Sequence, residues 1–263
     1  MRPRIYRAEA IVLRTIDFGE ADRVLTLLTR HFGKVRVVAK GIRRSTSRLA
    51  GHAEPLSHAT FHLARGRELD VLTGAEPRAA YREVRDDLVR IASGLYVVEL
   101  ADRFSADRSP CAPLFECVQA ALDHLEAGFP PALVCRWFDL HLLDRSGFRP
   151  ELARCVECRA EPPETTNLWS PEAGGLVCAR CAPDLASAPS ALGTLSVRAL
   201  KSLRYLIASD FGGAARLRLD VALAAELERH LRRFLQHVLD REVQSARFLD
   251  EIARLPRAQA AAR

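Results

Sequence analysis

Two pairs of closely spaced cysteines are the clearest candidates for a metal site in this sequence. Cys155 and Cys158 form the first C-x2-C pair. After 19 intervening residues, Cys178 and Cys181 form the second. Two thiolates three positions apart on a tight turn can both point at one ion, and two such turns complete a tetrahedron. The spacing therefore predicts one structural zinc ion (Zn2+) per chain, bound by four sulfur atoms.

A metal ion with four thiolate ligands has no open coordination position for water, so this site predicts structure rather than metal catalysis. Reactive disulfides or free thiols are the alternatives. Either alternative would need an oxidising compartment or a C-x2-C pair at a strand-to-helix junction, and the sequence indicates neither. Between the pairs, residues 168–170 and 174–177 predict a short hairpin. The metal would replace a hydrophobic core that is too small to fold alone.

Positive charge is concentrated in the first fifth of the chain. The formal net charge is +6, whereas residues 1–50 contain twelve Arg or Lys and four acids, a balance of +8. Seven cations and no acid lie between Arg30 and Arg48. A local cationic field of this kind favours phosphate-rich partners. A solvated basic face without a partner is the alternative.

Within this region, residues 34–40 alternate in character like a half-buried strand. Lys34, Arg36 and Lys40 share one face, and the next residues, 41–48, form a loop with glycine, hydroxyls and arginines. Such groups bond phosphate oxygens. The residues predicted to contact the phosphates of a nucleic acid are Arg14, Lys34, Arg36, Lys40, Arg43, Arg44 and Arg48.

Aromatic residues near these cations are few. Phe18, Phe32 and Phe61 are the candidates, and each is also a candidate for the core. Binders of single strands usually stack bases on several aromatic rings. Their scarcity predicts contact with the sugar-phosphate backbone, and therefore salt-sensitive binding that tolerates any sequence.

Catalytic motifs are missing from the sequence. It contains no Walker A, G-x-G-x-x-G, G-x-S-x-G or H-E-x-x-H motif. His52, His58 and His62 cluster without an acid or cysteine at a useful position. We therefore expect a protein that is not an enzyme. We also expect a cytoplasmic protein, because the sequence contains neither a signal peptide pattern nor an apolar run long enough to span a membrane.

The spacing of apolar residues, which predicts the secondary structure, changes along the chain. Short β-rich runs at 7–16, 23–29, 34–40, 54–64 and 69–75 predict a small barrel. An OB-type barrel fits the strand count, and an SH3-like barrel remains open. Apolar residues then recur at helical spacing over 88–101, 113–125, 130–143, 195–207 and 221–239.

The predicted fold class is thus α+β and multidomain: an N-terminal OB-fold barrel, an α-helical domain and an inserted four-cysteine zinc module. We expect the barrel at 1–80 and the zinc module at 151–185. The helical domain would comprise 81–150 and 186–250, and a disordered tail would follow at 251–263.

Several of these segments together resemble the RecO family of bacterial recombination mediators. The similarity covers residues 4–239, and the glycine-arginine-serine loop and the two cysteine pairs are its most specific parts. One departure is Phe18, where many members have a tyrosine shortly before the glutamate. The segments that carry the resemblance are 10–13 (AIVL), 19–29 (GEADRVLTLLT), 33–35 (GKV), 39–48 (AKGIRRSTSR), 81–88 (YREVRDDL) and 96–100 (YVVEL).

The resemblance implies a DNA-repair function in the RecF-type pathway, in a bacterial protein that associates with the nucleoid. It implies binding of single- and double-stranded DNA, annealing of complementary strands, and cooperation with RecR in loading the recombinase RecA. It also implies that the single-stranded-DNA-binding protein docks its acidic, apolar C-terminal tail on the helical domain. Such a dock needs an apolar groove flanked by arginines, and Arg136 beside Trp137 or the stripe Arg198, Lys201 and Arg204 are candidates.

Two other functions remain open at the level of sequence. A zinc-stapled RNA-binding or transcription-associated factor would use the same basic residues on a different nucleic acid. A scaffold would depend mainly on the helical domain. Binding to single-stranded DNA, duplex DNA and RNA at several salt concentrations separates the first from a recombination mediator.

Overall fold

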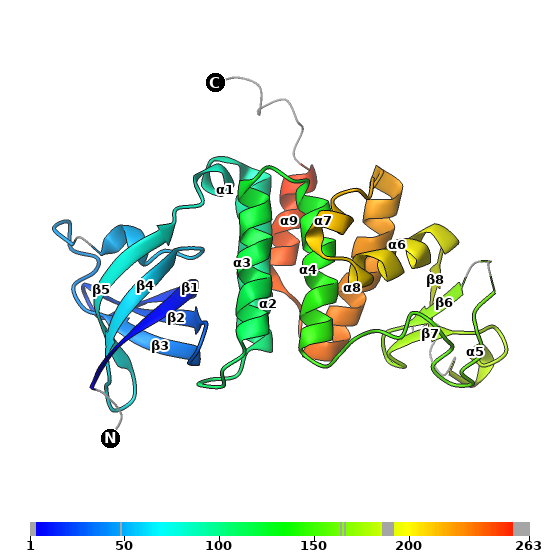
Figure 1. The fold of residues 1–263 in the computed structure, drawn as a ribbon, viewed down its shortest axis with the longest axis horizontal. Helices are drawn as coiled ribbons and strands as arrows, with labels where there is room; N and C mark the ends of the chain where they lie inside the picture. The colour runs from blue at the N-terminus through cyan, green and yellow to red at the C-terminus, as the bar shows by residue number, and fades with distance from the viewer. Residues whose placement is uncertain (1–3, 48, 164, 166, 186–191, 255–263) are drawn as a thin grey trace. The chain divides into compact units, whose positions relative to one another are not determined.

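The chain folds into two compact units. The structure is a computed structural model and describes residues 4–47, 49–163, 165, 167–185 and 192–254. One unit comprises the described residues of Met1–Gly128 and of Val243–Arg263, and the other comprises those of Phe129–Glu242. This differs from the predicted division, because the first three helices and the last one belong to the same unit as the barrel. Figure 1 labels these elements.

The first unit begins with a closed five-stranded barrel. Its strand order is β1-β2-β3-β5-β4, with β1 paired to β4 and a parallel pairing between β3 and β5. This Greek-key connectivity is that of an OB-fold, so the predicted fold class is confirmed. The strands are β1 (Ile5–Phe18), β2 (Asp22–Thr29), β3 (Gly33–Ala39), β4 (His58–Ala64) and β5 (Asp70–Ala79), with a short 3-10 helix, η1 (Ala50–His52), between β3 and β4.

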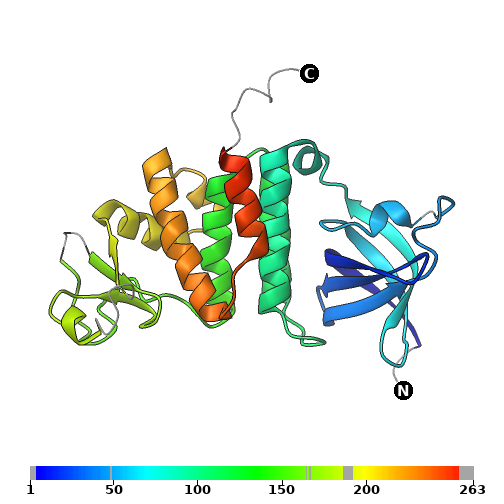
Figure 2. The same ribbon diagram turned by 180° about the vertical axis from the view of Figure 1, so that it is seen from behind.

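Alternation of side chains along these strands fills the barrel with apolar groups. Leu25 and Leu27 of β2, Val37 of β3 and Phe61 of β4 all lie in the core and are fully buried. A bulge after Val12 shifts the register of β1 against β2. A bulge adds one residue to one strand, so it changes which side chains beyond it face outward. Figure 2 shows the barrel from the opposite side.

Four helices complete the first unit: α1 (Arg82–Asp86), α2 (Leu88–Phe104), α3 (Ala112–Glu126) and α9 (Gln244–Arg254). Asp87 begins α2 as an N-cap, because its carboxylate accepts a hydrogen bond from the Arg90 amide at 2.8 Å. The predicted tail at 251–263 needs correction at its start, since 251–254 belong to α9. The rest of it, 255–263, lies outside the described residues.

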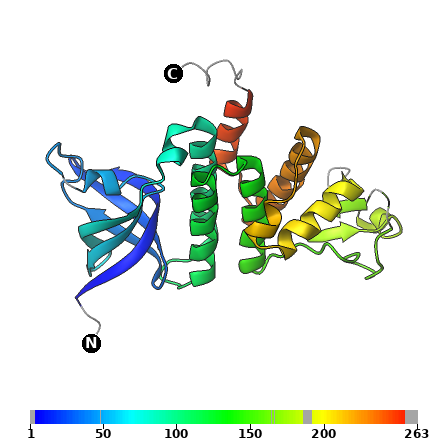
Figure 3. The same ribbon diagram turned by 45° about the horizontal axis from the view of Figure 1, so that its top comes forward.

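Hydrogen bonds to Glu99 of α2 attach α9 to this unit. The Glu99 carboxylate accepts hydrogen bonds from the backbone amides of Gln244 at 2.9 Å and Ser245 at 2.7 Å. These amides open α9, so a side chain of α2 caps a helix that lies far away in sequence. Figure 3 shows α9 in red at the end of the ribbon.

The second unit contains the helices α4 (Pro131–Arg145), α6 (Val197–Ala208), α7 (Phe211–Ala214) and α8 (Val221–Leu239). Ser196 and Asp220 cap α6 and α8 by accepting hydrogen bonds from amides in their first turns. The range predicted for α8 is confirmed residue for residue. Among the helices that the structure describes, none has the length and apolar character that crossing a membrane requires.

The cysteine segment forms a three-stranded sheet and one short helix, α5 (Ala182–Leu185). The strand order is β7 (Gly175–Val177), β6 (Asn167–Ser170), β8 (Gly193–Leu195). The predicted hairpin is confirmed as β6 and β7. Gly175 permits a close approach here, since a Cβ atom on it would lie 2.3 Å from the carbonyl oxygen of Glu151.

Candidate metal centre and nucleic-acid interface

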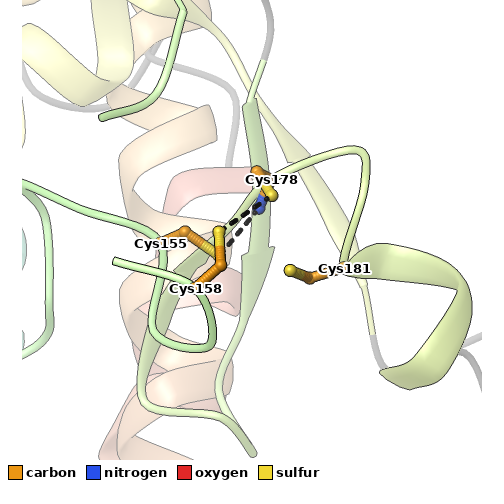
Figure 4. Close-up of side chains that lie close together, drawn as sticks. All are labelled: Cys155, Cys158, Cys178 and Cys181. Atoms are coloured by element: carbon orange, nitrogen blue, oxygen red, sulfur yellow. Dashed lines mark hydrogen bonds between the residues drawn. The ribbon is translucent and has the colours of Figure 1, made fainter. Parts of the chain in front are cut away.

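The four predicted cysteine ligands come together in one cluster (Figure 4). The Sγ atoms of Cys155, Cys158, Cys178 and Cys181 all lie within 4.8 Å of one another. Cys158 Sγ and Cys178 Sγ are 3.6 Å apart. A disulfide requires about 2.05 Å, whereas sulfur atoms on a tetrahedral zinc ion lie about 3.8 Å apart, given a metal–sulfur bond of about 2.3 Å. The geometry therefore fits shared coordination of a metal ion.

Backbone hydrogen bonds shape each cysteine pair into a tight turn. In the first turn, the Cys155 amide donates to the Ala160 carbonyl at 2.9 Å, and Arg159 takes a left-handed φ of 61°. In the second, the Cys181 amide donates to the Cys178 carbonyl at 3.0 Å. The turns are joined directly, because the Cys178 amide donates to Cys155 Sγ at 3.3 Å.

The thiols of this cluster differ in acidity. The Ala160 amide and then the Arg180 guanidinium lower the pKa of Cys158 to about 6. The hydrogen bond with Cys178 and burial raise the pKa of Cys181 to about 12. Neighbouring thiolates repel one another, so all four ionise together only when a cation neutralises them. The donor set is therefore suited to a thiolate-binding metal ion.

On the barrel, the predicted alternation of β3 is confirmed. Val35, Val37 and Ala39 are buried in the core, whereas Arg36 and Lys40 are exposed. Arg14 of β1 lies on the same outer face as Arg36, because Thr26 of β2 pairs with both of them across the sheet.

Lys34 has a different environment from the other predicted cations. Its side chain is 15% exposed, and Nζ donates to the Asp102 carbonyl oxygen at 2.6 Å and to Asp102 Oδ1 at 3.1 Å. These bonds hold the start of β3 against the end of α2. This role of Lys34 leaves no local signal in the sequence, because Asp102 lies 68 positions away. DNA contact by Lys34 stays a prediction.

The basic loop after β3 is held in place by the turn between β1 and β2. The Gly41 amide donates to Asp22 Oδ1 at 2.6 Å, and the Arg43 amide donates to the Ala21 carbonyl at 2.9 Å. Arg43 also pairs with Asp17 at 3.5 Å. Arg44 is exposed, and Arg48 lies outside the described residues. The loop is therefore anchored at its start, which its glycine and serine content did not indicate.

Comparison with protein families accounts for nearly the whole chain. Residues 1–81 match the model described as recombination protein O N terminal, and residues 85–247 match recombination protein O C terminal. The chain belongs to the RecO family. The resemblance noted from the sequence is thereby confirmed, and RecO membership supports a role in DNA repair.

Curated relatives agree with this assignment, and each is described as DNA repair protein RecO. The protein from a Roseiflexus species is 40% identical over 257 residues, which cover 98% of this chain and 89% of the relative. The protein from Dehalococcoides mccartyi is 34% identical over 95% of this chain and 97% of the relative. The protein from an Anaeromyxobacter species is 38% identical over 93% of this chain and 96% of the relative.

Proposed function

We propose that this chain is a recombination mediator that binds single- and double-stranded DNA through its barrel and anneals complementary strands. With RecR, it helps to load the recombinase RecA. The observation that carries the DNA-binding part is the placement of exposed cations. Arg14 and Arg36 share the outer face of β1, β2 and β3. Lys40 is exposed directly after β3, where the anchored loop with Arg43 and Arg44 begins.

This surface suits annealing for an electrostatic reason. Two complementary strands repel each other through their phosphates, and exposed arginines and lysines neutralise that repulsion. Contacts to the backbone carry no sequence information and leave the base edges available for pairing. A protein with such a surface accelerates annealing without ATP.

We further propose that the ion in the cysteine cluster is Zn2+ and that its role is structural. Four sulfur donors in tetrahedral spacing are typical of closed zinc sites. Cys155, Cys158, Cys178 and Cys181 would bind it and fill every coordination position. The ion would then staple the small β6–β8 sheet and take no part in DNA chemistry.

The DNA-binding proposal is tested by filter binding at several salt concentrations. The triple variant Arg36→Ala, Arg43→Ala, Arg44→Ala removes three exposed charges from the barrel. If all three contact phosphates, the slope of log affinity against log salt for single strands falls by about 2. A control triple variant removes the exposed Arg149, Arg216 and Arg229 from the second unit and keeps the wild-type slope. Equal affinity and slope in the first variant and wild type would refute the assignment.

Annealing and nucleic-acid class need their own assays. Fluorescent complementary oligonucleotides without ATP should anneal faster with the protein than without it, and an unchanged rate would remove annealing from the proposal. The same filter assay with RNA tests the alternative of an RNA-binding or transcription-associated factor. Tighter binding of RNA than of DNA at every salt concentration would favour that alternative.

For the acidic tail of the single-stranded-DNA-binding protein, we propose a hollow of about 500 Å³ beside α6. Its lining combines apolar and basic side chains: Val197, Arg198, Lys201, Ser202, Tyr205, Leu217, Arg218 and Leu223. Two of the sequence candidates lie elsewhere. Arg136 is buried beside Asp139, and the Arg204 Nε–H donates to the Leu152 carbonyl at 2.7 Å.

Fluorescence anisotropy with a labelled tail peptide tests this hollow. Lys201→Glu should weaken binding, because it places an acid against an acidic ligand. Arg149→Glu makes the same charge change outside this hollow and should not. Equal peptide affinity in wild type and Lys201→Glu would exclude the hollow.

A further inference from the structure

The outer face of the barrel carries an apolar row between cations. Across β1, β2 and β3, Ile16 pairs with Val24, and Val24 pairs with Val38. Directly paired residues of antiparallel strands project from the same face of a sheet. Three side chains on neighbouring strands span roughly 10 Å, which is enough for a nucleobase to lie against them.

Positively charged residues border this row along the strands. Two residues before Ile16 and Val38 lie Arg14 and Arg36, and two residues after Val38 lies Lys40. Arg14 and Arg36 belong to the same face, because side chains alternate with a period of two along a strand, and Lys40 lies one residue past the end of β3. The row is therefore bordered by two arginines on one side, and by Lys40 and the β2 residue Asp22 on the other.

Phe18 extends the row at the end of β1. It lies two residues beyond Ile16 on the same face, and its side chain is 56% exposed, while Ile16 is 50% exposed. The other two aromatic candidates are occupied elsewhere. Phe61 is fully buried in the core, and the Phe32 ring packs edge-on against Tyr6 with centroids 5.0 Å apart.

We propose that Phe18, with the row Ile16, Val24 and Val38, is a base-contacting platform for single-stranded DNA. This inference rests on the proposed DNA binding by the barrel, and it adds that the apolar row contacts the bases of the bound strand. A single strand presents flat apolar bases and phosphates together, which matches apolar side chains bordered by cations. Paired bases in a duplex keep their faces stacked on one another, so the platform selects unpaired strands.

Stacking is also compatible with annealing. A base that stacks on an aromatic ring uses its face, and its hydrogen-bonding edge stays free for a complementary strand. The platform would hold a strand with its bases ordered, while the cations neutralise its phosphates.

A comparison of two strands of equal length tests this proposal: oligo-dT and an abasic strand with the same sugar-phosphate backbone. Wild type should bind oligo-dT about five- to tenfold more tightly, because stacking on an aromatic side chain stabilises each base contact. Phe18→Ala should remove most of this preference and leave the salt dependence of both strands unchanged. Phe148→Ala, which truncates another exposed phenylalanine, should keep the preference.

Phe18→Trp supplies a direct readout of contact. Trp137 and Trp169, the two tryptophans of the chain, are both buried, so an indole introduced at position 18 reports mainly on the outer face. Oligo-dT should quench its fluorescence, and the abasic strand should not. The platform would be overturned if wild type bound oligo-dT and the abasic strand equally, or if Phe18→Ala kept the wild-type preference for oligo-dT. In either case, salt-dependent binding of both strands would still support the proposed function. If wild type showed no salt-dependent binding to either strand, both proposals would be rejected.

Discussion

The barrel and the cysteine module are both small β structures, but they are stabilised in different ways. The barrel closes on itself and fills its interior with side chains such as Leu25, Val37 and Phe61. The module has three strands of four, three and three residues. Its Trp169 packs outward against Phe234 of α8, with ring centroids 5.5 Å apart.

The two regions are expected to obtain their stability from different interactions. A closed sheet with a filled core has apolar burial as its driving force. A three-stranded sheet of this size buries too little to fold alone, so we expect it to depend on a metal ion bound by the cysteine cluster and on a neighbouring helix. We therefore expect the two regions to fail independently, and the following variants test that expectation.

The largest effect should follow from loss of a metal ligand. Cys178→Ser removes one of four sulfur donors, and a structural zinc site contributes about 10 kcal/mol or more of folding free energy to a small module. We expect hydrogen exchange to show unfolding of residues 151–185. DNA affinity of the barrel should change by no more than about twofold, as for distant independent sites.

Cys111→Ser is the matched control, because Cys111 lies outside the cluster. It should leave metal content and thermal stability unchanged. Chelation of the metal should reproduce the effect of Cys178→Ser. Equal thermal midpoints with and without zinc would contradict the idea that the metal stabilises the module.

The converse variant damages the barrel. Phe61 is fully buried in the barrel core, and Phe→Ala at such a position costs about 3–5 kcal/mol through lost transfer energy and a cavity. Phe61→Ala should therefore lower the unfolding midpoint of the barrel and weaken DNA binding. Metal content, measured by atomic absorption, should remain at one ion per chain; loss of metal in this variant would show that the two regions are not independent.

Acid should release α9 from the first unit. Burial raises the pKa of Glu99, but hydrogen bonds from Ser245, Gln244 and Arg103 outweigh it and hold the pKa below its ordinary value of 4.5. Because the pKa is lower in the folded state, this stabilisation is present above about pH 4.5 and disappears as the pH falls through the folded value. The protection factors of the α9 amides, which are exchange rates corrected for the intrinsic effect of pH, should fall over this window.

Glu99→Gln should remove this pH dependence and destabilise α9 by about 1–2 kcal/mol, since hydrogen bonds to a charged acceptor exceed those to a neutral one. Glu126→Gln is a control on a neighbouring helix, because Glu126 accepts the Val84 amide in the same unit. Protection factors in α9 that stay equal at pH 7 and at a pH well below 4.5 in wild type would refute the proposed role of Glu99.

The smallest effect concerns an acid beside the basic face. Asp107 is 58% exposed and pairs with Arg36 at 3.7 Å and Lys34 at 3.9 Å. Exposed pairs are weak, so Asp107→Asn should raise DNA affinity by at most about fivefold. The gain should be largest at low salt and disappear at high salt. Asp144→Asn, which frees Arg149 in the second unit, should have no effect on DNA affinity in the same titration.

Much of the fold was predictable because its signals are local. The five strands follow from alternation, and helix α8 follows from its apolar period and its capping aspartate, Asp220. The cysteine cluster was predictable because each pair of ligands lies within one turn. Helix α9 was missed, since its polar sequence gains its cap from Glu99, a residue 145 positions earlier.

Spacing within a few residues was enough to predict the barrel strands, the four-cysteine cluster and the cationic segment, because each of them depends on local sequence. Which of these cations are exposed depends on tertiary packing, which the local sequence does not specify. That packing placed Lys34 against Asp102 and left Arg36 and Lys40 on the surface. It also placed Phe18 and Ile16 beside those cations, since strand register and the bulge in β1 determine which side chains share a face.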